Sequence, residues 1–416
     1  MSSLTRISAS LPKSVRRTFI ALKYPNYRLW FGGQLISLVG TWMQATAQGY
    51  LIYSLTNSAK WLGVVGFASG IPTWLFTLYG GVIADRIPRR TLMLITQSAM
   101  MVLAFILAGL VYRNVVQPWE IVVLAFLLGV ANAFDAPARL SFVVELVDRE
   151  DLTNGIALNS TMFNLATVVG PAVAGLTYAA FGPAWCFAIN GLSFLGVIIA
   201  LLLMKLKSAP PVGEKTTAIL KIREGIKFVS VDPNIMVLLT SLVFLSVFGF
   251  GLMTLVPVWA VTILGGDVTT NGFLLSARGL GALIGALTVA ALAYRRIKGK
   301  IWTAGSFILP VTLFLFSFTR IFPLSFLLLI GVGWGLMTMV NTTNAMVQEK
   351  VPDELRGRVM SLYILVFQGA MPIGALLIGW TAAGLTAPTT VVICAAILLG
   401  YAIYSVLKHP ALRSTP

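Results

Sequence analysis

The sequence has 416 residues, of which 57% are hydrophobic and only 11% are charged. Soluble domains carry about 25% charged residues, and surface-to-volume scaling would leave much of this apolar area in contact with water. The composition therefore excludes a soluble globular protein and predicts an all-α membrane protein. The formal net charge of +16, from 30 Lys and Arg against 14 Asp and Glu, would suggest nucleic-acid binding in a soluble protein.

Twelve apolar runs are long enough to cross a hydrocarbon layer of about 30 Å, which needs roughly 20 helical residues. In chain order they cover residues 27–53, 61–84, 91–112, 119–144, 156–181, 184–205, 234–262, 269–294, 301–319, 323–347, 359–382 and 388–407. They predict 12 transmembrane helices in two six-helix bundles. The predicted parts of the chain are an N-terminal tail (1–28), a first bundle (29–205), a linker (206–232), a second bundle (233–407) and a C-terminal tail (408–416).

Basic residues lie almost entirely on one side of these spans. With the N-terminus inside, the inner segments hold 26 Lys and Arg and the outer loops hold 3. This asymmetry predicts that both termini are cytoplasmic, and it explains the positive charge without nucleic acid as a partner. In the linker, apolar residues at helical spacing among Lys221, Arg223 and Lys227 predict a short amphipathic helix on the inner membrane surface.

The two halves carry similar segments. Val143–Leu152 reads VVELVDREDL, and Met346–Leu355, 203 residues later, reads MVQEKVPDEL. Each follows a span and precedes a helix with a Gly/Pro kink. A six-helix repeat preserves orientation, so it predicts two bundles related by an axis along the membrane normal and alternating access between them. The alternative is that inner loops of membrane proteins simply resemble one another.

The loop after the second span reads GGVIADRIPRR. It resembles the signature of the major facilitator superfamily between helices two and three, with Pro88 where that family usually has Gly. The resemblance implies the major facilitator fold and a cytoplasmic gate formed by Gly81, Asp85, Arg86, Arg89 and Arg90. Independently of it, a carboxylate suits a helix N-terminus, and arginines suit carboxylates or lipid phosphates. The alternative role for these residues is topology and lipid anchoring alone.

The fifth span, NLATVVGPAVAG, resembles the Gly-Pro motif of antiporters in that superfamily, carried by Gly170, Pro171 and Gly175. The stretches FDAPARLSFVVELVDREDLTNGIALNS and VPDELRGRVMSLY resemble its branch of twelve-helix drug and siderophore exporters. This likeness implies transport of a small molecule and, through the antiporter motif, exchange against another solute.

Asp135 is the only acidic residue well inside a predicted span. A charge there costs about 2.5–3.5 kcal/mol, so it needs a partner or a function. One interpretation is an ion-pair network joining Asp135 to Arg139, one turn away, or to Arg89. The other is that Asp135 binds and releases a proton as its partners change. Glu145, at the inner end of the same helix, is a candidate for the charge relay or the gate network.

Arg278 lies about ten residues into the eighth span and cannot discard its charge. It should face an acidic partner, of which none is obvious in the second half, or a cavity, where it could attract an anionic or catecholate-like substrate. Alternatively, its long side chain could reach the outer surface. The first span has a stripe of polar residues at helical spacing, which favours a cavity as well. The candidate cavity residues are Gln34, Ser37, Thr41, Gln44, Gln48, Asn159, Asn164, Arg278 and Gln368.

Such a mainly uncharged cavity suits an amphipathic organic substrate. We therefore predict a secondary active transporter that exports amphipathic or lipophilic small molecules of the drug or siderophore type in exchange for protons. The alternative is a facilitator or importer of a small organic solute without proton coupling. The chain has no nucleotide-binding P-loop pattern, so ATP is not expected to drive it.

An enzyme is not expected, because the sequence offers no nucleophile–base pair or metal-ligand spacing. The single histidine, His409, lies in the C-terminal tail, and Cys186 and Cys394 lie in separate apolar runs. No cofactor and no metal are predicted. The expected partners are the small-molecule substrate, protons and membrane lipids, in a monomer of the bacterial inner membrane.

Overall fold

The computed structural model describes residues 19–205, 218–292, 295 and 297–413. The side chains of residues 77, 78, 80–82, 84–86 and 218–224 also lie outside the described part. The described part folds into helices and short connections. Of the predicted tails and linker, residues 1–18, 206–217 and 414–416 are not described.

The first half of the chain forms six long helices. They are α3 (Pro25–Thr56), α4 (Ala59–Arg86), α5 (Arg89–Tyr112), α6 (Pro118–Leu146), α7 (Leu152–Phe181) and α8 (Pro183–Leu203), with single turns η1 (Ile20–Lys23) and η2 (Arg149–Asp151) before α3 and α7. Three of the helices begin at a proline, whose fixed φ and missing N–H suit the first helical position. Gly182, with φ 89°, allows the tight connection from α7 to α8.

The second half begins with α9 (Ala218–Val231) and then forms six more helical segments. They are an interrupted segment that starts with α10 (Pro233–Phe244), followed by α12 (Val268–Leu292), α13 (Lys298–Phe318), α14 (Phe322–Lys350), α15 (Asp353–Gly384) and α16 (Ala387–Lys408). A last turn, α17 (Pro410–Arg413), follows α16. Long helical segments therefore occupy all twelve ranges that the sequence predicts as spans.

The interrupted segment changes its helical form four times after α10. It continues as a π-helical stretch η3 (Leu245–Phe250), a 3₁₀ stretch η4 (Gly251–Leu255), the short α11 (Val256–Val258) and a second π-helical stretch η5 (Trp259–Ile263). Pro257 has no N–H to donate to the preceding turn, which removes one regular hydrogen bond here. Such irregular stretches are frequent at functional sites, and η4 and α11 border the central cavity described below.

Ten of the described helices, from α5 to α16, are long and apolar enough to cross a membrane. The helices α3 and α4 have 32 and 28 residues but are not among these ten. In α3 the polar stripe faces the protein interior, where Gln34, Gln44 and Gln48 are buried. A polar interior face lowers the apolar character of a helix without exposing polar groups to lipid. Twelve spans with cytoplasmic termini thus stay a prediction.

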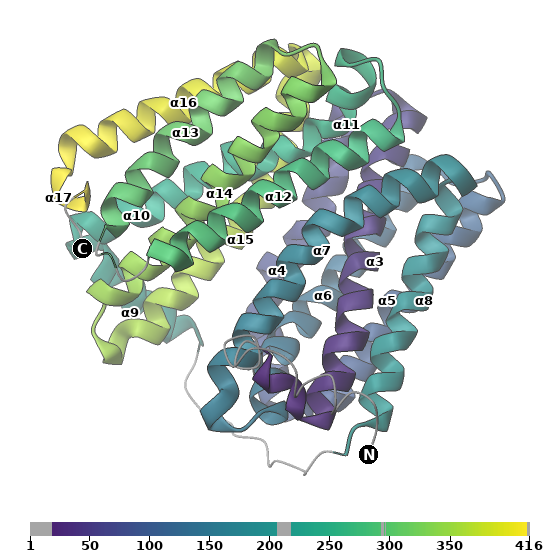
Figure 1. Ribbon diagram of the computed structural model, residues 1–416, viewed down its shortest axis with the longest axis horizontal. Helices are drawn as coiled ribbons and strands as arrows, with labels where there is room; N and C mark the ends of the chain where they lie inside the picture. Colours follow the sequence, from purple (N-terminus) through teal and green to yellow (C-terminus); the bar gives the residue numbers. More distant parts are fainter. Residues whose placement is uncertain (1–18, 206–217, 293–294, 296, 414–416) are drawn as a thin grey trace, which may run out of the picture.

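The helices pack as two bundles that meet at two crossings (Figure 1). In the first bundle α3 contacts α7 and α8, and α4 contacts α6. In the second, α14 contacts α12 and α13, and α13 contacts α16. Between the bundles, α4 crosses α15 and α7 crosses α12. The bundles converge toward the end near α11 and diverge toward the end that carries η1 and α9.

Glycines make the two crossings close. A Cβ atom at Gly63 of α4 would lie 2.7 Å from the carbonyl oxygen of Ala375 of α15. A Cβ atom at Gly272 of α12 would overlap the carbonyl oxygen of Pro171 of α7. Helices approach this closely in membranes where small residues remove the side chain between them. The glycine contacts thus hold the bundles together toward their converging end.

Side-chain contacts continue the closure at that end. The hydroxyls of Tyr53 in α3 and Thr262 in η5 share a hydrogen bond of 2.6 Å. The ammonium of Lys60 in α4 lies 4.3 Å from the ring centroid of Trp380 in α15. Polar and cation–π contacts therefore join the two bundles outside the apolar crossings.

The helix α9 packs on the second bundle at the diverging end. A Cβ atom at Gly225 would lie 3.0 Å from the carbonyl oxygen of Arg358, in the first turns of α15. Val229 is buried, whereas Ile226 is exposed. A helix therefore occupies part of the predicted linker and packs on α15, while its place on the membrane surface stays a prediction.

Candidate functional site

A cavity of about 390 Å³ lies between the two bundles. Helices α3 to α8 of the first bundle line it, together with η4, α11 and α12 of the second. Its volume falls within the range of about 300–1,000 Å³ that is typical of small-molecule sites. The polar lining residues are Thr41, Gln44, Thr46, Gln48, Ser69, Asn132, Asn190, Thr254 and Arg278. Apolar side chains complete the wall, as an amphipathic ligand would require.

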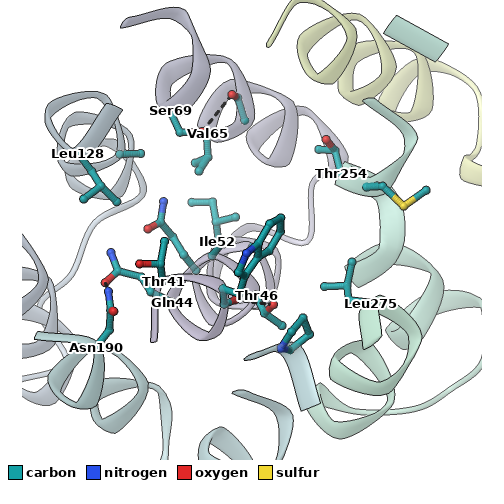
Figure 2. A pocket seen from close by; sticks show the side chains of 18 of the residues that line it. Thr41, Gln44, Thr46, Ile52, Val65, Ser69, Leu128, Asn190, Thr254 and Leu275 are labelled. Carbon is teal, nitrogen blue, oxygen red and sulfur yellow. Dashed lines mark hydrogen bonds between the residues drawn. The ribbon is translucent and has the colours of Figure 1, made fainter. Parts of the chain in front are cut away.

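An amide pair forms one side of this cavity. The Nδ2 of Asn190 in α8 donates a hydrogen bond of 2.7 Å to the Oε1 of Gln44 in α3. Both residues are buried, and Figure 2 shows them together on one side of the pocket, with Thr254 and Leu275 of the second bundle on the other. Asn190 was missed in the sequence because it is a single amide in an otherwise apolar helix.

The stripe on α3 divides between two cavities. Thr41, Gln44 and Gln48 line the central one. Gln34, Ser37 and Thr41 line a second cavity of about 160 Å³ within the first bundle. The cavities share part of their walls, made of Thr41, Trp42, Met100, Asn132 and Phe194.

Three candidate cavity residues lie elsewhere. Asn159, Asn164 and Gln368 are not among the residues that line either cavity. Asn164 donates to the carbonyl oxygen of Ser160, one turn back on α7. Gln368 is exposed on α15. Asn164 thus uses its amide N–H on its own helix, and Gln368 lies at the surface, so residue type alone did not place these residues in a cavity.

Asp135 lies at the wall of the second cavity and is only 1% exposed. Its Oδ1 accepts hydrogen bonds from Thr96 Oγ1 at 2.8 Å and from Gln97 Nε2 at 3.0 Å. The Nε of Arg139 lies 3.6 Å from its Oδ2. Three partners from α5 and α6, all in one bundle, thus surround the carboxyl group.

The other residue considered as a partner, Arg89, does not pair with Asp135. Its Nη1 lies 2.5 Å from Oε1 of Glu145, which joins the start of α5 to the end of α6. In the second bundle Lys298 forms an ion pair with Glu349, joining the start of α13 to the end of α14. Each bundle therefore has one such ion pair between two neighbouring helices at the diverging end.

The rest of the first motif is only partly described. The side chains of Gly81, Asp85 and Arg86 lie outside the described residues. Arg90 Nη2 donates to the carbonyl oxygen of Leu202 at the end of α8. Pro88 is the N-cap of α5, with φ −51°. Because this φ is negative, glycine is not required at the position.

The motif of the fifth span lies where α7 meets two other helices. A Cβ atom at Gly170 would contact Val39 and Trp42 of α3. Pro171 lines the central cavity, and a Cβ atom at Gly175 would lie 3.0 Å from the Cα of Thr269 of α12. The motif allows α7 to lie close to its own bundle and to the opposite one.

Arg278 is the one charged residue among those that line the central cavity, and it is 9% exposed. Its Cζ lies 5.7 Å from the ring centroid of Trp42, a cation–π contact between the bundles. The structure thus differs from the alternative in which Arg278 reaches the outer surface. The close contact of Gly333 with the Arg278 carbonyl oxygen holds this part of α12 against α14.

A polar cluster that the sequence analysis missed ties η1 to the start of α7. Lys23 Nζ lies 2.5 Å from Oδ2 of Asp151, and the Tyr24 hydroxyl donates to the same oxygen at 2.8 Å. The hydrogen bond to Asp151 raises the pKa of Lys23 above its ordinary value. The residues are more than 120 positions apart, so only the fold brings them together.

Residues 17–415 match a protein family described as transmembrane secretion effector. Among individual proteins, the chain is 29% identical over 380 residues to the enterobactin exporter EntS of Escherichia coli, which covers 87% of this chain and 86% of that protein. It is 24% identical over 353 residues to the staphyloferrin A transporter of Staphylococcus aureus, covering 84% of this chain and 88% of that protein.

Solved structures show the same fold. The nucleoside transporter NupG superposes with a TM-score of 0.70 at 15% identity, over 91% of this chain and 96% of that one. A bacterial homologue of the human lysosomal transporter Spinster, in an inward-facing and unoccupied conformation, superposes with a TM-score of 0.68 at 12% identity, over 94% of this chain and 99% of that one. Sequence identities this low show a shared fold but say nothing about the substrate.

Proposed function

The chain belongs to the transmembrane secretion effector family of the major facilitator superfamily, a group of multi-pass membrane transporters, and on that premise we propose that it exports an amphipathic small molecule of the siderophore or drug type. The central cavity is the observation that carries this proposal. Its wall combines apolar side chains, neutral amides and one cation, which suits an organic molecule with a polar group better than a small ion. The names of the two relatives favour a siderophore.

The direction of access follows from the predicted topology. With cytoplasmic termini, the converging end of the bundles faces outward and the diverging end faces the cytoplasm of a bacterial inner membrane. The contacts of Tyr53 with Thr262 and of Lys60 with Trp380 then close the outer side. An exporter in this state would load its substrate from the cytoplasm before the bundles rock to open the outer side.

Exchange against protons would use Asp135. It is the one acidic residue among those that line the two cavities. The hydrogen-bond donors of its carboxyl group lie on α5, and its arginine partner lies on α6. A change in the packing of α5 against α6 during transport would alter these contacts and so couple the carboxyl group to the movement of the helices.

An efflux panel tests the proposal directly. Cells that lack their own pumps and express this chain are loaded with siderophores and lipophilic drugs, and efflux is followed with and without an uncoupler. We expect faster efflux of at least one amphipathic compound and its collapse when the uncoupler dissipates the proton gradient. If the uncoupler leaves efflux of the compound unchanged, a facilitator is supported instead. If the cells accumulate more of the compound than the vector control does, an importer is supported.

A further inference from the structure

The guanidinium of Arg278 is a buried charge, and in the part of the chain that the structure describes no acceptor pairs with its Nε. Only 9% of the residue is exposed, and its Nε is buried without a partner. Within the described residues, no carboxylate lies within salt-bridge distance of it. Arginine cannot release its proton inside a protein, so the charge persists. Buried charges in proteins are ordinarily paired, and this one lacks its counter-ion.

The contact with Trp42 leaves the donors of Arg278 free. A cation–π contact uses the charge of the guanidinium and none of its N–H groups, and the Nε of Arg278 is buried without a hydrogen-bond partner. Trp42 comes from α3 of the first bundle and Arg278 from α12 of the second, and both line the central cavity. The unoccupied donors therefore belong to a site that both bundles form together.

We propose that Arg278 binds an anionic group of the transported molecule, such as a carboxylate, a catecholate or a sulfonate. This inference rests on the proposed function, whose substrate class it narrows to an organic anion. Arg278 is the one charged residue of the wall, so the site pairs with a single anionic group. The apolar wall, which includes Leu128 and Phe194, would cover the body of the same molecule.

The helix that carries Arg278 is fixed on both sides, so the site is formed in advance. A Cβ atom at the neighbouring Gly279 would overlap the carbonyl oxygen of Thr167 in α7. One at Gly333 of α14 would overlap the carbonyl oxygen of Arg278 itself. Binding to a preformed charge avoids the cost of ordering a mobile side chain. The guanidinium should therefore discriminate strongly between charged and neutral ligands.

Two dyes of nearly identical shape test this. The probes are the anionic 1-anilinonaphthalene-8-sulfonate and its uncharged analogue N-phenyl-1-naphthylamine, titrated by fluorescence against the full-length protein in zwitterionic nanodiscs, with empty nanodiscs subtracted. We expect the wild type to prefer the anion. In Arg278→Gln the anionic dye should bind about 10- to 100-fold more weakly, which is the loss expected for a hydrogen bond to a charged group. The affinity for the neutral dye should not change.

The chain supplies its own control. Arg320 also lies over an indole, 6.0 Å from the Trp259 ring, but it does not line the cavity. Arg320→Gln should leave both affinities as in the wild type, and Arg278→Lys should keep part of the preference for the anion. Unchanged neutral-dye binding shows that Arg278→Gln is folded.

The outcomes separate this inference from the proposed function. Equal binding of both dyes by the wild type, no binding of either, or equal weakening of both in Arg278→Gln overturns the role of Arg278. Efflux of uncharged compounds in the panel above would support export but contradict the anion-binding role of Arg278. An absence of any efflux, combined with charge-selective dye binding, would instead contradict export while leaving the anion site intact.

Discussion

Asp135 shows how a single buried charge is kept in a membrane protein. A carboxylate in the middle of a span costs about 2.5–3.5 kcal/mol on insertion scales. Thr96, Gln97 and Arg139 supply hydrogen-bond donors and a counter-charge that offset this cost. All three belong to the first bundle, so the charge is balanced without any contribution from the second.

Replacing Asp135 with Asn tests its part in coupling. The amide preserves the shape but cannot exchange a proton, so we expect at least a tenfold loss of transport driven by an imposed pH gradient, with dye binding within about twofold of the wild type. Transport in proteoliposomes at several internal pH values measures both effects. Near-normal dependence on pH in Asp135→Asn would refute the coupling role.

The exposed pair of Arg89 and Glu145 provides the matched control. Glu145→Gln also removes the carboxylate partner of an arginine, but near the protein surface, where an ion pair contributes only about 0–1 kcal/mol. We expect Glu145→Gln to keep its response to the pH gradient. An equal loss in both variants would show that the gradient acts on something other than Asp135.

The four helices of the two crossings show how secondary structure elements set the closed end. Gly63 and Gly70 of α4 lie against Ala375 and Pro372 of α15, and Gly272 lies against α7. These contacts are mostly with backbone atoms, which cannot move away without moving a whole helix. Side-chain volume at these glycines should therefore change the distance between the bundles and leave the helices themselves intact.

The substitution Gly272→Ala tests this. Overpacking of this kind costs about 1–3 kcal/mol, which corresponds to a shift of roughly 5- to 100-fold between two states. We expect the outer end to open. To measure this, a cysteine replaces the cavity residue Thr254 in a variant that lacks Cys186 and Cys394. Its rate of labelling by a membrane-impermeant maleimide added outside then reports opening of the outer end.

The control is Gly109→Ala in α5, where an added Cβ would meet nothing within 4 Å. It should label like the parent protein, whereas Gly272→Ala should label several-fold faster. Identical labelling of the two variants would mean that the crossing of α7 and α12 does not hold the outer end closed.

At the scale of the whole molecule, the two bundles are the moving parts. Each has its own internal packing, and their mutual contacts are concentrated at the converging end. Alternating access then needs these contacts to separate in every cycle, while those inside each bundle persist.

A disulfide between the bundles should stop transport. Cys substitutions at Gly66 and Ala375 place their Cβ atoms 2.9 Å apart, within about 1 Å of the usual disulfide spacing. We expect oxidation to abolish efflux and reduction to restore it. The control pair, Gly33 and Ala200, joins α3 to α8 inside one bundle, with the Gly33 Cβ 3.2 Å from the Ala200 Cβ. Full transport with the first disulfide formed would rule out rocking of the bundles.

Much of the fold was readable in the sequence, because burial in lipid imposes a simple rule on each helix. Every span needs about 20 apolar residues whatever its neighbours are, so the twelve helical segments could be predicted from local composition. The pair of Asp135 with Arg139 was also local, since residues four apart on a helix are adjacent. The polar stripe on α3 predicted an interior face for the same reason.

The tertiary structure decided which polar residues meet. The sequence could not show that Asn190 binds Gln44, that Thr96 and Gln97 hold Asp135, or that Asn159, Asn164 and Gln368 lie away from both cavities. It also left open whether Arg278 reaches the surface or the cavity. The physical reason is that hydrophobic burial acts on each helix separately, whereas a binding site depends on the rotation and separation of several helices. Only the packing of the two bundles fixes those.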